Sequence, residues 1–321
     1  MDCRYPPLDS GHDIYARFAE PRGDNVKQRA SAIITDLDNT LFDWVGIWYR
    51  SFNAMLSVLV EQSGIPQEQL EEEIRRVHQR HGTSEYAFLV QELPSLRTAQ
   101  AGGADPAQKY GAAIEAYRKA RDESLALYPT VLKTLETIRN RGCLIIAYTE
   151  SMAFYTNYRI RRLGLDGLID LLYSPPDHDL PAGTLPKSIR RYPADAYELK
   201  RTRHRYIPAG VKKPDPRVLR QIIDEIGVTT DDIVYIGDSL MKDIAMAVHL
   251  GARSALARYG AAQNREEYEL LRRVTHWTDG EVEKERHLLE GPAVRPTFYL
   301  DRSFSELLAH IELTPFERDG A

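Results

Sequence analysis

Cysteine is scarce in this chain, with two residues among 321. Cys3 lies in the extreme N-terminal segment and Cys143 in a predicted buried strand, so we expect no structural disulfide, as is usual in the reducing cytoplasm. Long apolar runs are also lacking, because none approaches the ~20 residues that a membrane span needs. The N-terminal segment has no apolar core of the signal-peptide kind. The sequence therefore predicts a cytoplasmic protein without a membrane span.

An excess of positive charge is lacking as well. The formal net charge is -5 at pH 7, which gives no reason to expect general affinity for nucleic acid. The sequence has no internal repeat and no extended low-complexity segment. What is present is the composition of a globular enzyme, 43% hydrophobic and 28% charged. The length suits one large α/β domain with a second domain inserted into it.

Residues 31–43, SAIITDLDNTLFD, carry the strongest functional signal. Ala32 to Thr35 are small or β-branched, which predicts a short, fully buried strand of a parallel sheet. Asp36 and Asp38 follow where this strand ends, and ligands of open α/β sheets bind at that edge. Alternate residues of an extended chain point the same way. Both carboxylates can therefore face one small volume, where their repulsion calls for a cation or a shared proton.

Two ordinary interpretations compete with a binding site in this segment. Asp and Asn favour turns, so the residues could form only a strand and a turn. The D-x-D-N-T sequence also opens like a calcium loop. However, Leu41 stands where that loop requires glycine, and Ile47 where it requires the bidentate glutamate. The calcium loop is excluded.

Residues 44–127 have the pattern of helices almost throughout. The apolar positions of the first helix recur at spacings of three and four; they are Trp48, Phe52, Met55, Leu56 and Leu59. Pro66 and Pro106 stand where helices begin, and Thr83 or Ser84 can cap a helix between them. About 80 residues of helix between two strand patterns predict an inserted helical domain.

The rest of the chain alternates strands and helices. Predicted strands cover residues 143–149, 168–173, 232–236, 253–257 and 297–300, and predicted helices cover 131–141, 153–163, 216–226, 241–250 and 303–311. This order predicts an α/β fold with a Rossmann-like, doubly wound parallel sheet, built from residues 31–43 and 128–321. We expect residues 1–30 to be a surface extension with a possible helix at 13–20, and two inserts at about 174–210 and 263–295.

The insert at 174–210 contains a cluster of bases with tyrosines between them. The bases are Lys187, Arg190, Arg191, Lys200, Arg201, Arg203 and Arg205, and the tyrosines are Tyr192, Tyr197 and Tyr206. Such a cluster can stack on and pair with nucleic acid or another polyanion. A solvated surface is the more ordinary interpretation in an acidic chain. The sequence therefore favours a solvated surface, and nucleic-acid binding stays the alternative.

Polar residues stand at three further element ends. Thr149 ends the second predicted strand, Lys213 precedes the helix that Pro216 helps to start, and Asp238 ends the fourth strand, with Asp243 five residues later. Singly, these could be a turn hydroxyl, a solvated lysine and a helix cap. Their joint order is harder to explain in that way.

Together these segments resemble the haloacid dehalogenase (HAD) superfamily. Its four motifs appear here as Asp-Leu-Asp-Asn-Thr-Leu at 36–41, Thr149, Lys-Pro-Asp-Pro at 213–216, and Gly-Asp-Ser at 237–239 with Asp243. The helical residues 44–127 lie between the first two motifs, a position similar to the C1 cap of subfamily I. The insert at 174–210 is longer than that subfamily usually has, and short for the α/β cap of subfamily II.

The resemblance implies phosphoryl transfer, which needs positioning and charge neutralisation. It implies that Asp36 is the nucleophile that accepts the phosphoryl group. Asp38 would protonate the leaving alkoxide and then activate water. Thr149 would donate a hydrogen bond to the phosphoryl group, and Lys213 would offset its charge.

The resemblance also implies a bound Mg2+, held by Asp36, the backbone carbonyl of Asp38, and Asp238, since hard cations prefer oxygen ligands. Asp243 would tune the metal or hold Lys213. Haloacid dehalogenases typically lack an aspartate at the position of Asp38, so its presence favours phosphate esters over dehalogenation.

The sequence thus predicts a Mg2+-dependent phosphatase that acts on a small phosphorylated metabolite through an aspartyl phosphate. A phosphomutase of the same superfamily and a polyanion-binding protein are the alternatives. The sequence leaves the substrate and the oligomeric state open.

Overall fold

The computed structural model describes residues 27–98, 105–177, 190–208, 210–262, 265–278, 280 and 294–317. Cys3, Lys187, the helix expected at 13–20 and most of residues 281–295 lie outside these ranges. Cys143 is free and buried. No helix among the described residues is long and apolar enough to cross a membrane.

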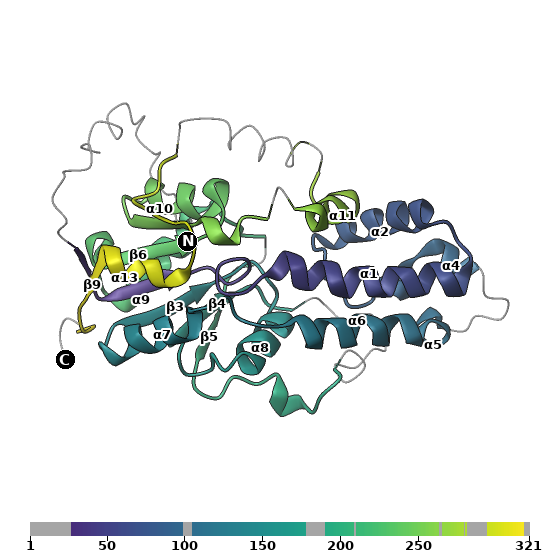
Figure 1. The fold of residues 1–321 in the computed structure, drawn as a ribbon, viewed down its shortest axis with the longest axis horizontal. Coiled ribbons are helices and arrows are strands. Elements are labelled where there is room, and N and C mark those ends of the chain that lie inside the picture. Colours follow the sequence, from purple (N-terminus) through teal and green to yellow (C-terminus); the bar gives the residue numbers. More distant parts are fainter. Residues whose placement is uncertain are drawn as a thin grey trace, which may run out of the picture.

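A seven-stranded parallel sheet forms the centre of the α/β part, in the order β5-β4-β3-β2-β6-β7-β8 (Figure 1). The strands are β2 (Ala32–Thr35), β3 (Leu144–Tyr148), β4 (Leu171–Ser174), β5 (Arg203–Tyr206), β6 (Ile233–Gly237), β7 (Arg253–Ala257) and β8 (Phe298–Leu300). Strand β2 is fully buried between β3 and β6. Because all strands run the same way, the residues that follow β2, β3 and β6 emerge at one edge. The predicted Rossmann-like fold class is confirmed.

Helices cover both faces of this sheet, as expected for a doubly wound fold. They are α7 (Val131–Asn140), α8 (Ala153–Arg162), α9 (Pro216–Ile226), α10 (Ala245–His249) and α13 (Leu307–His310), with a π-helical turn η5 (Leu240–Ile244) and the 3-10 turns η3 (Ala194–Ala196), η4 (Thr230–Asp232), η6 (Arg258–Gly260) and η7 (Phe304–Glu306). Ile33 belongs to one buried apolar cluster and Ile34 to another. Neighbouring strand residues point to opposite faces, so β2 anchors a core on each side.

A third apolar cluster lies in residues 44–124, which we call the helical block. Its helices are α1 (Trp44–Ser63), α2 (Gln67–His81), α3 (Leu89–Glu92), α4 (Pro94–Thr98), α5 (Pro106–Lys109) and α6 (Gly111–Ser124). Helices α1, α2 and α6 lie beside one another, to the right of the sheet in Figure 1. Trp48 stacks on Phe52 in this cluster, with ring centroids 4.5 Å apart.

Helix α11 (Glu266–Val274) packs on the helical block, although it lies far along the chain. Its residues Tyr268, Leu270 and Leu271 join the apolar cluster of the block. The insert expected at 263–295 therefore contains a charged helix. Its place against α1 and α2 was not expected.

Three short strands differ from the sequence prediction. Strand β1 (Gln28–Ala30) lies within the segment expected to be an extension, and pairs in parallel with β9 (Ile311–Leu313). The helix expected at 303–311 ends at His310 because Ile311 enters β9. The insert at 174–210 supplies β5, an exposed edge strand beside β4.

Candidate active site

Three of the predicted site residues follow adjacent strands of the sheet. Asp36 follows β2, Thr149 follows β3 and Asp238 follows β6. The backbone hydrogen bonds between β2 and β6 continue one residue past the end of β2, where the Asp36 N–H donates to the carbonyl of Ile236 over 2.8 Å. The sheet order thus brings together groups that are more than 200 residues apart in sequence.

The ammonium group of Lys213 links two of the aspartates. It donates to Oδ1 of Asp36 over 2.5 Å and to Oδ1 of Asp243 over 2.8 Å. It lies 4.9 Å from the ring centroid of Tyr148 and 5.7 Å from that of Tyr235. The Lys213 side chain is almost fully buried. Its two acidic partners raise the pKa of Lys213 well above its usual value, although burial alone would lower it.

Asp243 owes its place to the π-helical turn η5 that follows β6. Its carboxylate accepts hydrogen bonds from the Ser239 N–H and from the Tyr235 hydroxyl. The backbone at Gly237 passes very close to it: a Cβ there would lie 2.2 Å from the Asp243 carboxyl carbon. Glycine at position 237 therefore makes room for this carboxylate.

The three carboxylates fit a divalent cation. Oxygens of Asp36, Asp238 and Asp243 lie within 4.8 Å of one another. Burial raises the pKa of Asp36 to about 7, with Asp243 and Asp38 adding to the effect and Lys213 opposing it. Burial also raises the pKa of Asp238, with Asp243 and Asp36 adding to the effect and Lys213 and Lys242 opposing it. Within the described part of the chain, Asp238 has no ion-pair partner. One lysine thus faces three acids, and an oxygen-preferring cation would balance the charge.

Asp38 points to a different set of partners. Its Oδ2 accepts a 2.5 Å hydrogen bond from the Ser151 hydroxyl, and its Oδ1 lies 3.5 Å from Nη1 of Arg159. The other end of the Arg159 guanidinium binds Glu85 of the helical block. Burial raises the pKa of Asp38, while Arg159 opposes the shift.

Thr149 is buried, and its hydroxyl accepts a hydrogen bond from the Ser151 N–H over 3.0 Å. No bond joins this hydroxyl to Asp36 or Lys213 among the described contacts. The neighbouring Glu150 accepts from the Lys213 N–H and from Lys242 Nζ. The segment after β3 thus supports Lys213 and Asp38.

The loop after Asp38 is held by a later part of the chain. Asn39 has a positive φ of 59°, which asparagine tolerates better than most residues. The Tyr259 hydroxyl donates to the Thr40 carbonyl over 2.6 Å. Arg265 forms two hydrogen bonds, of 2.9 and 3.0 Å, with Asp43. These contacts fix the entry to α1.

A cavity of about 410 Å³ lies between the helical block and the start of α8. Residues of α1, α2, α6 and the 84–91 segment line it, with Phe154 and Tyr155 on the α8 side. The walls combine apolar and aromatic side chains with polar and charged ones, among them Glu85, Arg118 and Arg121. Glu85 connects this cavity to Asp38 through Arg159.

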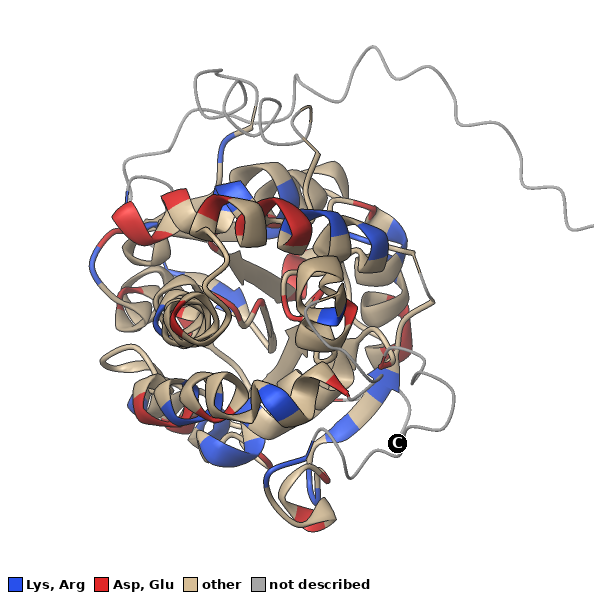
Figure 2. Ribbon diagram, turned by 90° about the vertical axis from the view of Figure 1, so that its right-hand side faces the viewer, with Lys and Arg blue, Asp and Glu red and all other residues tan. Residues whose placement is uncertain are grey.

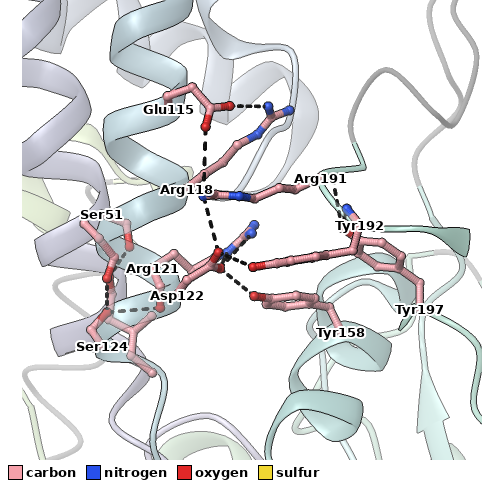
Figure 3. A network of polar contacts seen from close by, with 12 residues as sticks. Ser51, Glu115, Arg118, Arg121, Asp122, Ser124, Tyr158, Arg191, Tyr192 and Tyr197 are labelled. Carbon is pink, nitrogen blue, oxygen red and sulfur yellow. Dashed lines mark hydrogen bonds and ion pairs between the residues drawn. The ribbon is translucent and has the colours of Figure 1, made fainter. Parts of the chain in front are cut away.

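Residues 190–197, which we call the strap, contact the helical block (Figure 3). The Asp122 carboxylate on α6 accepts from the hydroxyls of Tyr158 and Tyr192 and pairs with Arg191 at 3.3 Å. Arg205 of β5 pairs with Glu225 on α9. On the side seen in Figure 2, basic and acidic residues are interspersed. Bases of the insert thus bind acidic groups of the same chain.

Sequence reasoning missed Glu85, Ser151 and Arg159. Ser151 stands two residues after Thr149, and this proximity was the one available signal. Glu85 and Arg159 stand 74 residues apart and belong to no common motif. Only the packing of the helical block against α8 brings them together.

Comparison with known proteins gives a consistent family. The model of the haloacid dehalogenase-like hydrolases matches residues 30–251. The glyceraldehyde 3-phosphate phosphatase of Methanopyrus kandleri is 24% identical over 266 residues, which are 81% of this chain and 95% of that protein. The crystal structure of a 2-haloacid dehalogenase from Pseudomonas syringae pv. Tomato has a TM-score of 0.51 at 19% identity and covers 87% of this chain and 98% of its own. At that identity the likeness concerns the fold alone.

Proposed function

Because this chain belongs to the haloacid dehalogenase-like hydrolase family, we propose that it is a Mg2+-dependent phosphatase of a small phosphomonoester. The observation that carries the proposal is the cluster of Asp36, Lys213 and Asp243, with Asp238 within reach of the same cation. A buried nucleophile with a fixed cationic partner suits attack on an anionic phosphoryl group. The nearby Asp38 adds the proton donor that an ester leaving group needs.

In the first step, a carboxylate oxygen of Asp36 forms a bond to phosphorus while the bond from phosphorus to the ester oxygen breaks. Asp38 transfers a proton to the departing alkoxide. In the second step, Asp38 takes a proton from water, whose oxygen attacks phosphorus and releases Asp36 and inorganic phosphate. Lys213 balances the negative charge beside Asp36 in both steps.

Asp36, Asp238, Asp243 and the backbone carbonyl of Asp38 are the groups that we propose around Mg2+, with Asp243 also holding Lys213. When bound, the cation supplies charge neutralisation for the phosphoryl oxygens and keeps carboxylates ionised. We also propose that the Thr149 hydroxyl turns its proton to a phosphoryl oxygen, because its acceptor side already binds the Ser151 N–H.

We propose that residues 44–127, which are the helical block and its link to the sheet, form the cap of this enzyme. Its separate apolar cluster and its position between the first two motifs support this role. The M. kandleri relative is named for glyceraldehyde 3-phosphate, and a three-carbon phosphate is therefore the first substrate to test. A cap closed over the site would exclude water and bulky substrates.

The phosphomutase alternative uses the same aspartyl phosphate and returns the group to a sugar. A requirement for a bisphosphate activator would favour it. The polyanion-binding alternative has less support, because Arg191 and Arg205 already pair with acidic groups of the chain.

The test is hydrolysis of p-nitrophenyl phosphate and of a panel of phosphorylated metabolites, with Mg2+ and with a chelator. We expect Mg2+-dependent release of phosphate by the wild type and none by Asp36→Asn. The control is Asp231→Asn, the same substitution at an exposed site. Full activity of Asp36→Asn would refute the proposed function.

A further inference from the structure

Arg159 of α8 is an enclosed cation beside the candidate site. Its side chain is 3% exposed. The guanidinium carbon lies 5.7 Å from the ring centroid of Phe42 and 5.7 Å from that of Tyr155. Aromatic faces attract a guanidinium and leave it little freedom to turn. The charge of Arg159 therefore has a fixed position.

Both carboxylate oxygens of Asp38 have a polar partner in residues 151–159. Ser151 Oγ donates to Oδ2 over 2.5 Å, and Arg159 Nη1 lies 3.5 Å from Oδ1 and 3.4 Å from Ser151 Oγ. A carboxylate held at both oxygens has a defined orientation. A proton donor must have such an orientation to reach its acceptor.

The second carboxylate on Arg159 comes from the helical block. Glu85, in the connection between α2 and α3, binds Nη2 more closely than Asp38 binds Nη1. The side chains of Glu85 and Arg159 are 9% and 3% exposed. Asp38 and Glu85 thus share one buried guanidinium. When the helical block is docked, Glu85 binds Nη2, and Nη1 remains for Asp38.

We propose that Arg159 is a positioning residue that orients Asp38 for protonation of the leaving group, and that Glu85 couples this orientation to docking of the helical block. This inference rests on the proposed function. Its competitor is a purely structural role, in which the Arg159–Glu85 pair only fastens the helical block to α8. The two roles differ in how a variant responds to the leaving group.

The experiment compares kcat/KM for phenyl phosphate and p-nitrophenyl phosphate, two esters of similar shape. The nitro group stabilises the departing phenolate, so that ester depends less on a proton donor. We expect Arg159→Met to lower kcat/KM for phenyl phosphate at least tenfold more than for p-nitrophenyl phosphate. Asp38→Asn lacks the proton donor itself, and therefore gives the largest difference between the two esters that this comparison can show. Arg162→Met, the same change at an exposed position of α8, should leave the ratio of the two kcat/KM values unchanged.

Two further variants keep the test decisive where Arg159→Met does not fold. Arg159→Lys retains the charge without the planar fork, and should give an intermediate ratio. Glu85→Gln retains the side-chain shape and removes the charge that competes with Asp38 for Arg159. It should change the ratio of the kcat/KM values for the two esters at least threefold. Equal loss for both esters, or an unchanged ratio in these folded variants, would overturn the inference. An inactive wild type would instead refute the proposed function, and this inference with it.

Discussion

The hydroxyl of Tyr192 in the strap donates a 2.7 Å hydrogen bond to the carboxylate of Asp122 on α6. This bond joins a segment from the β4–β5 connection to the helical block (Figure 3). Burial would raise the pKa of Asp122, but the hydroxyls of Tyr158 and Tyr192, together with Arg121, hold it below the usual value. The strap therefore ties the helical block to the α/β part through a charged acceptor.

Removal of the Tyr192 hydroxyl should weaken this tie. A hydrogen bond to a charged group contributes roughly 1.5–3 kcal/mol, and Tyr192 is partly exposed, so we expect Tyr192→Phe to lower the free energy of unfolding by about 1 kcal/mol. Urea unfolding measures the loss, and hydrogen exchange should quicken in the second half of α6. Tyr206→Phe is the control, since Tyr206 is 61% exposed. Equal losses in both variants would contradict a role for this bond.

The central strands could be predicted from sequence because their physical cause is local. Ala32–Thr35 and Ile233–Gly237 are apolar stretches between turns, and both are fully buried. Arg203–Tyr206 gave no such signal, since its Arg-His-Arg-Tyr sequence suits an exposed edge. Strand β1 forms only because β9, more than 280 residues later, lies beside it.

The candidate site shows the same division. Asp36, Lys213, Asp238 and Asp243 could be identified as a set because they stand in motifs at element ends, and the fold brings their side chains together. The environment of Asp38 could not be predicted. Its contact with Arg159 spans 121 positions and depends on how α8 packs beneath the helical block.

Mg2+ should stabilise the protein, and this effect should depend on Asp238. A cation that binds only the folded state adds about 2.7 kcal/mol at a concentration of 100 Kd. We expect the wild type to melt at a higher temperature in Mg2+ than in a chelator, and Asp238→Asn to melt at the same temperature in both. Asn fits the same space, and no protein ion pair is lost within the described residues. A full Mg2+ shift in Asp238→Asn would contradict this site.

Stability should fall as the pH drops from about 6.5 towards 4, in part because of His78. Burial lowers the pKa of His78 from 6.5 to about 4, although its Nδ1 donates to the Val274 carbonyl over 2.6 Å. In this range the unfolded chain binds a proton that the folded protein excludes, so unfolding becomes more favourable. At 1.36 kcal/mol per pH unit, the loss is roughly 3 kcal/mol at most.

Urea unfolding at pH 7.5 and pH 5 measures this dependence. His78→Asn can keep a donor near the position of Nδ1 and cannot titrate in this range, so its stability should change less with pH than that of the wild type. His249→Asn, at an exposed position, should keep the wild-type dependence. If the His78 variant loses as much stability as the wild type, protonation of His78 is not the cause.

A methyl group at position 260 should displace the loop that carries Asp38. The Gly260 backbone lies so close to this loop that a Cβ would be 1.7 Å from the Asn39 carbonyl oxygen. The atoms that this Cβ would meet first belong to the Asn39 main chain, so no flexible side chain can move aside. Asn39 and the adjacent Asp38 must therefore shift. A small misplacement of a catalytic group can cost about 100-fold in rate, and we expect Gly260→Ala to lower kcat by that order while the protein remains folded.

Gly111→Ala is the matched control, because nothing lies within 4 Å of a Cβ at that helical position. It should keep full activity and gain up to about 1 kcal/mol of stability. Wild-type kcat in Gly260→Ala would mean that the loop can move without disturbing Asp38.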